Sequence, residues 1–316
     1  MTILGIERHH EVAIVEMGMN ARGEIARMAE VAEPDVGLVT NVGPAHIGML
    51  GSIEEVAAAK GELYRALDVV RGVAVVNADD RRVVDQARQS GVRNLRTFGR
   101  AASDVQLVSE RPDGEGQHVE LRIDGAKFQA FLPFLGAHNA LNAAGAIAAA
   151  TALPEIAPTQ AQLVAGLAKS EGLKGRLKVV RAGRVWVVDD CYNANSASML
   201  AAIETISSKA RASKARFVAL LGEMRELGEY GPEEHARVGR ALVDARADLV
   251  AAFGPDAQPI AREAAAGGLT AKHESEDVAA LYAWLSPQLA DGDFVLVKGS
   301  RGIRMERFID RLKEAI

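Results

Sequence analysis

Residues 187–199 read Val-Val-Asp-Asp-Cys-Tyr-Asn-Ala-Asn-Ser-Ala-Ser-Met, and this segment limits the possible folds more than any other. Two aliphatic residues end a strand, Asp189 and Asp190 follow at its tip, and an Asn- and Ser-rich turn opens a helix. In an open α/β sheet, ligands bind beyond the carboxyl ends of the strands. The carboxylate pair therefore predicts a ligand site. The alternative is that Asp190 is only the N-cap of the following helix.

Short aliphatic runs alternate with helical patterns in the first part of the chain, which predicts a mostly parallel sheet. The glycine-rich stretch 41–51 is typical of a ligand-facing loop, and Ser52 and Glu55 form a capping-box pattern after it. The expected strands are residues 11–16, 36–40 and 73–77, and the expected helices are residues 21–31, 52–67 and 80–90.

Residues 104–132 follow a different pattern, in which apolar and polar residues alternate around Asp124-Gly125. This alternation predicts a hairpin, so an antiparallel patch should decorate the first domain. An Ala-rich helix is expected over residues 136–150, and a shorter one over residues 160–169.

A linker is expected at residues 171–176, and it divides the chain into domains at residues 1–172 and 173–316. The second domain is predicted to be a doubly wound, Rossmann-like α/β unit. Its expected strands lie near residues 177–181, 185–188, 215–221, 248–253 and 293–298.

Composition excludes several classes of protein. The chain has 316 residues, 48% of them hydrophobic, so it can form cores in about two domains. A net charge of −5 argues against binding nucleic acid by charge alone. Cys191 is the single cysteine, which excludes an intrachain disulfide and fits a reducing cytoplasm. No apolar run is long enough to cross a bilayer, and residues 1–10 are not expected to act as a signal peptide.

Two groups of polar residues stand out in the first domain. Glu16 ends one expected strand and His46 follows the next, so both could face one Mg²⁺ ion that also binds substrate phosphates. Each also has a simpler explanation, Glu16 as a helix cap and His46 as a loop histidine. Lys60 has Ala and Gly neighbours that suggest close packing. A buried amine has a lowered pKa and can attack CO₂, although a surface lysine is the usual case.

Further candidates begin helices or follow strands. His138 and Asn139 open the Ala-rich helix, whose N-terminus attracts anions. Arg176, at the linker, could reach a phosphoryl group or could only form a salt bridge. Residues 222–228 and the Lys-Gly-Ser-Arg run at 298–301 each follow an expected strand, and the latter could bind a carboxylate.

Two nucleotide-binding motifs are missing from the sequence. It contains no Gly-Lys pair and therefore no G-x-x-x-x-G-K-[ST] phosphate loop. It also contains no G-x-G-x-x-G, which makes a dinucleotide dehydrogenase an unsuitable interpretation.

Taken in order, the motifs resemble those of the Mur ligases, the ATP-dependent amide-forming enzymes of peptidoglycan synthesis. The Asp-Asp-x-Tyr-Asn-Ala-Asn and Gly-Glu-Met-x-Glu-Leu-Gly runs resemble the branch that adds D-alanyl-D-alanine. The resemblance covers nearly the whole chain, and it is carried by residues 15–19, 23–25, 41–51, 59–62, 136–142, 174–176, 189–195, 222–228 and 298–301.

The resemblance implies a role for each matching residue. In the first domain, Glu16 and His46 would hold Mg²⁺, with two ions expected, and a carbamylated Lys60 would add an oxygen ligand. Lys60, His46 and Arg176 would be the catalytic residues, with Arg176 on the transferred phosphate. The implied ATP contacts are His138, Asn139 on adenine, Asp190 on the ribose, Tyr192 and Asn193, and the implied dipeptide contacts are Asn195, Lys298, Ser300 and Arg301.

The resemblance also implies the substrates and the missing parts. The expected reaction joins D-Ala-D-Ala to UDP-N-acetylmuramoyl-tripeptide through an acyl phosphate, in a monomer that binds no nucleic acid and spans no membrane. Members of the family carry an N-terminal domain and a phosphate loop, which would precede Met1 and would complete the ATPase domain at residues 1–172. The chain by itself is therefore expected to be inactive.

Two alternatives stay open. One is another amide ligase of this family, such as a folylpolyglutamate-type enzyme, although the Tyr192-Asn193-Ala194-Asn195 run argues against it. The other is a non-catalytic module that binds a dipeptide or a nucleotide, and the missing phosphate loop favours it.

Overall fold

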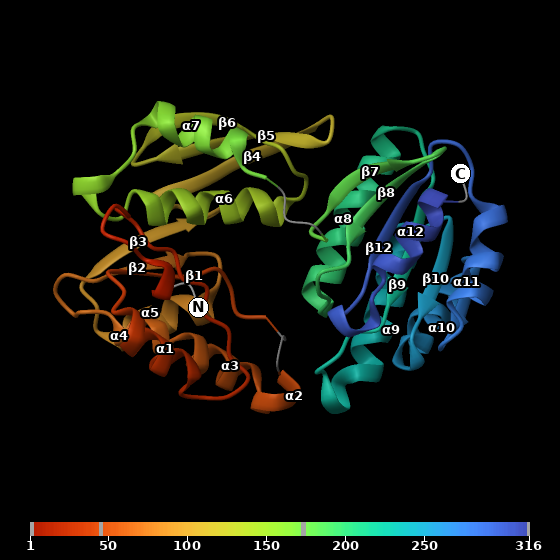
Figure 1. The fold of residues 1–316 in the computed structure, drawn as a ribbon, viewed down its shortest axis with the longest axis horizontal. Helices are drawn as coiled ribbons and strands as arrows, with labels where there is room; N and C mark the ends of the chain where they lie inside the picture. Colours follow the sequence, from red (N-terminus) through yellow and green to blue (C-terminus); the bar gives the residue numbers. More distant parts are fainter. Residues whose placement is uncertain (1–2, 44–46, 172–174, 315–316) are drawn as a thin grey trace. The chain divides into compact units, whose positions relative to one another are not determined.

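The computed structural model describes residues 3–43, 47–171 and 175–314. The chain forms two compact units (Figure 1). The first contains Met1–Ser109, Glu120–Gln129 and Leu141–Leu163, and the second contains Glu110–Val119, Ala130–Ala140 and Val164–Ile316. The expected boundary between residues 172 and 173 stays a prediction.

Each half of the chain contributes one six-stranded sheet. The first has the strand order β1-β2-β3-β4-β5-β6, with β1 to β4 parallel. Its strands are β1 (Val36–Val39), β2 (Val73–Asn77), β3 (Asn94–Gly99), β4 (Val105–Asp113), β5 (Gly116–Ile123) and β6 (Ala126–Leu132). The helices of this half are α1 (Glu24–Ala32), α2 (Ile47–Leu50), α3 (Ile53–Lys60), α4 (Glu62–Ala66), α5 (Arg81–Ser90), α6 (Ala137–Ala150) and α7 (Gln160–Lys169).

The second sheet has the order β11-β10-β9-β12-β8-β7, and β7 is its antiparallel strand. Its strands are β7 (Lys178–Ala182), β8 (Val185–Asp190), β9 (Phe217–Gly222), β10 (Leu249–Phe253), β11 (Ala271–Glu274) and β12 (Phe294–Lys298). The helices are α8 (Ser196–Ala212), α9 (Gly231–Asp244), α10 (Gln258–Ala266), α11 (Val278–Leu285) and α12 (Glu306–Glu314).

The aliphatic strands of the second sheet are buried on both faces, as parallel strands must be. Side chains alternate between the faces, so Val188 packs on one core and Val187 on the other. Helices α8, α9 and α10 supply the first core, and α11 and α12 supply the second. The predicted doubly wound, Rossmann-like unit is confirmed.

The predicted antiparallel patch is confirmed by the β5–β6 hairpin. The two strands are neighbours in the sheet and are joined by Asp124 and Gly125 alone. Both turn residues have positive φ, 49° and 84°, as a two-residue type I′ turn requires.

The expected strand at residues 11–16 is wrong. These residues form no regular element, and the side chains of Val12 and Ile14 are exposed. An aliphatic run becomes a strand only when a neighbouring strand takes up its hydrogen bonds and a layer covers its side chains. Strand β1 ends the sheet order and pairs with β2, and residues 11–16 obtain neither a partner strand nor a cover.

Two strands were not predicted. Strand β3 reads Asn-Leu-Arg-Thr-Phe-Gly and β11 reads Ala-Lys-His-Glu, so neither contains an aliphatic run. Each is placed by parallel pairing with a strongly aliphatic neighbour, β2 or β10. Backbone pairing therefore overrides the weak intrinsic preference of these residues.

Helix α1 takes its N-terminal cap from another helix. Its N-cap, Gly23, has φ 87° and no side chain to accept a hydrogen bond. The carboxylate of Glu62, at the start of α4, accepts the backbone N–H groups of Gly23 (2.8 Å) and Ala26 (3.2 Å) and pairs with Arg22 (3.0 Å). Burial alone would raise the pKa of Glu62, but the bonds from Gly23, Arg22 and Ala26 lower it below the ordinary value. Glu62 therefore ties the start of α1 to α4.

We expect Glu62→Gln to lower the free energy of unfolding by about 1–3 kcal/mol, because one of the two oxygens that accept these bonds becomes an amide nitrogen and the negative charge is lost. The wild-type advantage should be complete above the ordinary glutamate pKa of about 4.3. It should shrink as the pH falls through the lower folded-state pKa, because the group is then protonated. Urea unfolding at pH 7 and at decreasing pH measures this. The matched control is Glu55→Gln, which removes an exposed partner of Arg22, and an equal loss in both variants would contradict the capping role.

Candidate active site

Strands β8, β9 and β12 bring their carboxyl ends to one edge of the second sheet. In the parallel register, Lys298 lies opposite Asp190 on one side and Leu221 on the other. The Lys298 Nζ is 2.7 Å from Asp190 Oδ2, and the two residues are only 2% and 8% exposed. A buried ion pair thus joins two strand ends.

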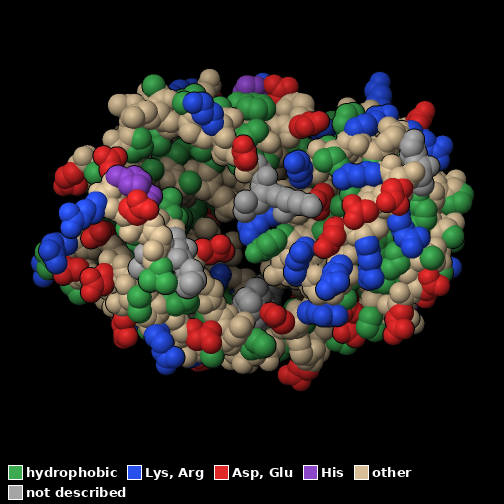
Figure 2. All heavy atoms as spheres, viewed as in Figure 1, with side chains coloured by type: hydrophobic (Ala, Val, Ile, Leu, Met, Phe, Trp, Pro, Cys, Tyr) green, Lys and Arg blue, Asp and Glu red, His purple; other side chains and the backbone are tan. Residues whose placement is uncertain are grey.

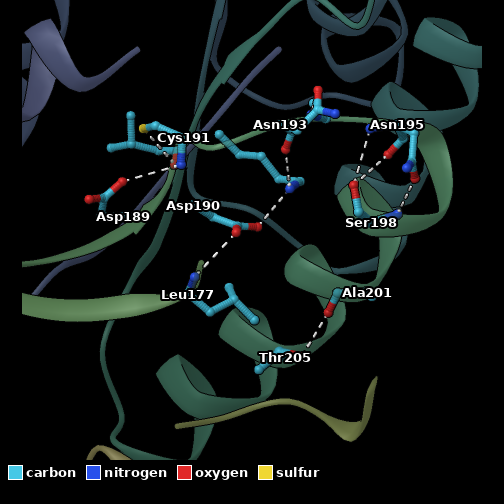
Figure 3. Close-up of polar contacts among 12 residues, drawn as sticks. Leu177, Asp189, Asp190, Cys191, Asn193, Asn195, Ser198, Ala201 and Thr205 are labelled. Carbon is cyan, nitrogen blue, oxygen red and sulfur yellow. Dashed lines mark hydrogen bonds and ion pairs between the residues drawn. The ribbon is translucent and has the colours of Figure 1, made fainter. Parts of the chain in front are cut away.

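Asp190 is not the N-cap of α8, so that alternative interpretation is wrong. The cap is Asn195, whose side chain accepts the Ser198 N–H (2.9 Å) while the Ser198 hydroxyl accepts the Asn195 N–H (3.1 Å) (Figure 3). Four residues separate Asp190 from this cap, because residues 191–194 form a turn before the helix begins. Asp190 is therefore available for another purpose.

Hydrogen bonds from neighbouring segments hold the turn between β8 and α8 in place. Lys298 donates a second hydrogen bond, of 2.9 Å, to the backbone oxygen of Asn193. Asp190 Oδ1 accepts the Leu177 N–H at 3.2 Å (Figure 3). The Asn193 side chain accepts the Ala194 N–H at 2.8 Å. These bonds fix the predicted nucleotide-contacting residues 190–193 relative to β12 and β7.

Arg176 and Tyr192 form an exposed pair beside this turn. The Arg176 guanidinium stacks on the Tyr192 ring, 4.6 Å from its centroid. The Tyr192 N–H bonds the Gly175 oxygen at 3.0 Å, and Gly175 has φ 78°. A Cβ on Gly175 would lie 2.9 Å from the Tyr192 nitrogen, so only glycine allows this close approach. The geometry presents a cation at the strand edge, where an anionic ligand can reach it.

The loops that follow β9 and β12 are joined by hydrogen bonds. The Ser300 hydroxyl accepts the Arg225 N–H at 2.8 Å, and the Ser300 N–H bonds the Glu223 oxygen at 3.1 Å. The buried Glu223 carboxylate binds Arg225 Nε at 3.0 Å and the Asp256 N–H at 3.1 Å. Arg301 is exposed and pairs with Glu306 at 3.1 Å.

The sequence interpretation noted the run 222–228 but did not identify Glu223 or Arg225 individually. Their partners Asp256 and Ser300 lie far along the chain, so no local signal could have found them. His235 also belongs to this network. Its Nε2 accepts the Met224 N–H at 2.8 Å, and its Nδ1 lies 2.7 Å from the Gly231 oxygen. This arrangement requires the neutral ring, and burial lowers the pKa of His235.

Lys60 reaches the carboxyl end of β1 in the first unit. Its Nζ donates a hydrogen bond of 2.7 Å to the Asn41 oxygen. Burial lowers the pKa of Lys60, and the charge of Asp80 partly opposes this shift. Asp80 also accepts the Val42 N–H at 2.7 Å, and Asn77 donates to the Thr40 oxygen at 2.7 Å. Three side chains therefore hold the start of the loop after β1.

Two of the three predicted metal ligands, Glu16 and Lys60, lie in the described part of the chain. Glu16 is exposed in the irregular stretch before α1, because no strand forms there. His46 lies outside the described residues. Among residues 3–43, 47–171 and 175–314, no group of three His, Cys, Asp or Glu side chains could hold a metal ion.

His138 and Asn139 open α6, as predicted. The Asn139 side chain donates 2.7 Å to the Leu135 oxygen, which fixes its orientation. The buried Nδ1 of His138 has no hydrogen-bond partner among the described residues. Burial lowers the pKa of His138, with the charge of Asp190 raising it and that of Lys298 lowering it.

The surface gives no sign of a single-sign charged face in the view shown. Figure 2 shows Lys and Arg side chains interspersed with Asp and Glu side chains.

Within the part of the chain that the structure describes, no helix is long and apolar enough to span a membrane.

Comparison with known proteins agrees with this architecture. The family model "Mur ligase middle domain" matches residues 1–150, and "Mur ligase, glutamate ligase domain" matches residues 175–301. The UDP-N-acetylmuramoyl-tripeptide–D-alanyl-D-alanine ligase of Synechocystis sp. is 36% identical over 98% of this chain and 65% of its own length. That of Escherichia coli is 31% identical over 99% and 68%.

A solved structure agrees as well. The MurF ligase of Thermotoga maritima in complex with ADP superposes with a TM-score of 0.84 at 26% identity, covering 99% of this chain and 69% of the ligase. The chain belongs to the Mur ligase family, and it spans about two thirds of the length of these relatives.

His235 should make the second unit sensitive to mild acid. Its folded-state pKa is lowered, so its contribution is complete above the ordinary histidine pKa of about 6.5 and is lost as the pH falls. We expect His235→Gln to cost about 1–3 kcal/mol at pH 7.5 and to show a smaller decline toward pH 5. Denaturant unfolding across this range measures both, with the exposed His9→Gln as control. A variant as pH-dependent as the wild type would contradict the assignment.

Cys191 should be unreactive in the folded protein. Its thiol is buried, bonds the Val297 oxygen at 3.3 Å, and has a raised pKa because of burial and the neighbouring Asp189. Since the thiolate is the reacting form, an aromatic disulfide reagent at pH 8 should label it at least about a hundredfold faster in urea than in buffer. Rapid native labelling would instead indicate an accessible nucleophile.

Proposed function

We propose that this chain forms the catalytic and amine-binding part of an ATP-dependent ligase that joins D-Ala-D-Ala to UDP-N-acetylmuramoyl-tripeptide. The observation that carries the proposal is the buried Asp190–Lys298 pair beneath the Tyr-Asn-Ala-Asn turn. This pair holds a carboxylate at the carboxyl end of a strand, which is where α/β proteins bind nucleotides. Similarity to ligases named for this reaction, such as those of Synechocystis sp. and Escherichia coli, supports the choice of substrates.

The chemistry accounts for the residue types. A carboxylate is a poor electrophile, so the tripeptide carboxylate first takes the γ-phosphoryl group of ATP and releases ADP. The amine of D-Ala-D-Ala then attacks the acyl carbon, and phosphate leaves as the amide bond forms. Several anions must therefore meet at one site, and cations that neutralise their repulsion provide much of the catalysis.

The proposed nucleotide contacts lie on α6 and around the end of β8. Asp190 binds the ribose hydroxyls, and Tyr192 and Asn193 contact the nucleotide beside it. Asn139 binds adenine with His138 next to it. Arg176, whose guanidinium is exposed on the Tyr192 ring, binds the transferred phosphoryl group.

The proposed metal contacts are Glu16, His46 and a carbamylated Lys60. Mg²⁺, when bound, neutralises the phosphate oxygens. The lowered pKa of Lys60 favours its neutral amine, which is the form that attacks CO₂.

The predicted dipeptide contacts differ in whether their side chains are already engaged within the protein. The Asn195 side chain already caps α8, and the Ser300 hydroxyl already accepts the Arg225 N–H. Arg301 is exposed and paired only at the surface with Glu306, so its guanidinium can exchange that partner for a substrate carboxylate. Of the predicted set, Arg301 is the best placed to bind the dipeptide.

The proposal is tested by amide formation from ATP, UDP-N-acetylmuramoyl-tripeptide and D-Ala-D-Ala, with product detected by mass. We expect no turnover by the chain alone. We expect D-Ala-D-Ala-dependent turnover when the first third of the Synechocystis relative is fused before it. Arg176→Lys in the fusion should lower the rate at least about tenfold, because a lysine cannot bind phosphate bidentately.

Other outcomes of this assay favour the alternatives. Turnover with L-glutamate in place of D-Ala-D-Ala would indicate a folylpolyglutamate-type ligase. Nucleotide or dipeptide binding by calorimetry, without turnover in the fusion, would indicate a binding module. Turnover by the chain alone would contradict the expected inactivity.

Carbamylation of Lys60 has a direct test. In ¹³C-bicarbonate at pH 8, NMR should show a carbamate resonance that disappears in Lys60→Arg. The lowered pKa of Lys60 predicts that it forms at a lower pH than carbamates of exposed lysines. The control Lys209→Arg changes a lysine on α8 that bonds the Gly114 oxygen. A carbamate signal unchanged in Lys60→Arg would contradict the proposal.

A further inference from the structure

We propose that Lys298 is a positioning residue for the nucleotide-binding turn and does not contact the dipeptide carboxylate. This inference rests on the proposed function, because it uses the expected role of Asp190, and it reassigns Lys298 from the role that the sequence suggested.

The parallel register makes the pairing of Lys298 and Asp190 unavoidable. The two residues lie opposite each other on neighbouring strands, and both follow residues of the same core, Leu296 and Val188. Side chains two apart on a strand point to the same face. Lys298 and Asp190 therefore extend side by side on the α8 face of the sheet, and their charged ends meet at 2.7 Å.

The Lys298 amine has little capacity left for a substrate. Two of its three N–H donors are used by Asp190 Oδ2 and the Asn193 oxygen. The residue is 2% exposed, so a dipeptide carboxylate could reach it only by displacing Asp190. That exchange would leave a buried carboxylate without its cation, which is strongly unfavourable.

The same contacts prepare Asp190 for a ribose. A carboxylate offers about four lone-pair positions, and Lys298 and the Leu177 N–H occupy one on each oxygen. The remaining positions can accept the two ribose hydroxyls. The bond from Lys298 to the Asn193 oxygen also fixes the position of the turn three residues beyond Asp190. One amine thus sets both the orientation of the carboxylate and the path of the chain beyond it.

The exposed cations of this edge contrast with Lys298. The Arg225 and Arg301 side chains are 53% and 67% exposed, and each keeps part of its guanidinium open to solvent. A carboxylate can replace Glu306 on Arg301 at the surface, and it can bind the part of the Arg225 guanidinium that the Nε bond to Glu223 leaves open. The buried Lys298 therefore has a structural role, whereas the exposed Arg225 and Arg301 can bind a substrate.

The reactivity of Cys191 measures whether this turn stays closed, because Cys191 is the only thiol of the chain and follows Asp190 directly. Its Sγ bonds the oxygen of Val297, the residue before Lys298. We expect Lys298→Met and Asp190→Asn each to speed native labelling of Cys191 at least about tenfold, since each leaves a buried group unpaired. The double variant should label no faster than either single variant, because it removes the pair without leaving a lone charge. Arg301→Met, at the same edge, should label at the wild-type rate.

A second measurement separates positioning from a purely structural role. Calorimetric titration of the Lys298→Met and Arg301→Met variants with ADP and with D-Ala-D-Ala compares the two affinities. For Lys298→Met we expect the dissociation constant of ADP to rise at least about tenfold, about 1.4 kcal/mol, with that of D-Ala-D-Ala changed less than about twofold. Lys298→Arg, which keeps the charge, should recover part of the ADP affinity.

Either of two results would overturn the proposal. One is a Lys298→Met variant that loses D-Ala-D-Ala affinity and keeps ADP affinity. The other is labelling of Cys191 at the wild-type rate in that variant. If the wild type binds neither ligand, the proposed function fails for this chain, and the labelling experiment alone decides whether Lys298 holds the turn.

Discussion

A buried charge in a protein needs a partner of opposite charge, and the pair formed by Asp190 and Lys298 organises the second unit around that need. Neither residue tolerates burial alone, so β8 and β12 must stay in the register that places them opposite each other. The turn before α8 is fixed by the same amine, through the backbone of Asn193. The polar edge of the sheet follows from this one contact, because the aliphatic parts of both strands would allow other registers.

The first unit solves a similar problem with different groups. Its loop after β1 is held by Asn77, Asp80 and Lys60, each from an element that follows the loop in sequence. Glu62 caps a helix that has only glycine at its own N-cap. In both units, polar side chains hold the irregular backbone at strand ends, and in the second unit the neighbouring Arg176 and Arg301 stay exposed. This division suits a reaction that must collect several anions at a rigid site.

The Mur ligase family gives these arrangements a common purpose. Two models of this family match residues 1–150 and 175–301, which together make up most of the chain. The exposed Arg176 and Arg301 and the low-pKa Lys60 are the groups that the proposed acyl-phosphate chemistry needs. Glu223, Arg225 and His235 extend the site in a way that the motifs alone did not reveal.

The sequence by itself determined the alternating α/β order, the two-residue hairpin turn at Asp124 and Gly125, and the strand end at Asp190. Each of these depends on residues close together in the chain, where hydrophobic period and turn chemistry act directly. It also marked Lys298, which the family resemblance placed near the dipeptide carboxylate and to which we propose a positioning role.

Only the tertiary structure decided which polar group meets which. It left residues 11–16 without a partner strand, made Asn195 the cap in place of Asp190, and committed Lys298 to a carboxylate more than a hundred residues away. The reason is physical. Burial and pairing depend on neighbours brought in by strand order and register, and a linear pattern does not contain that information.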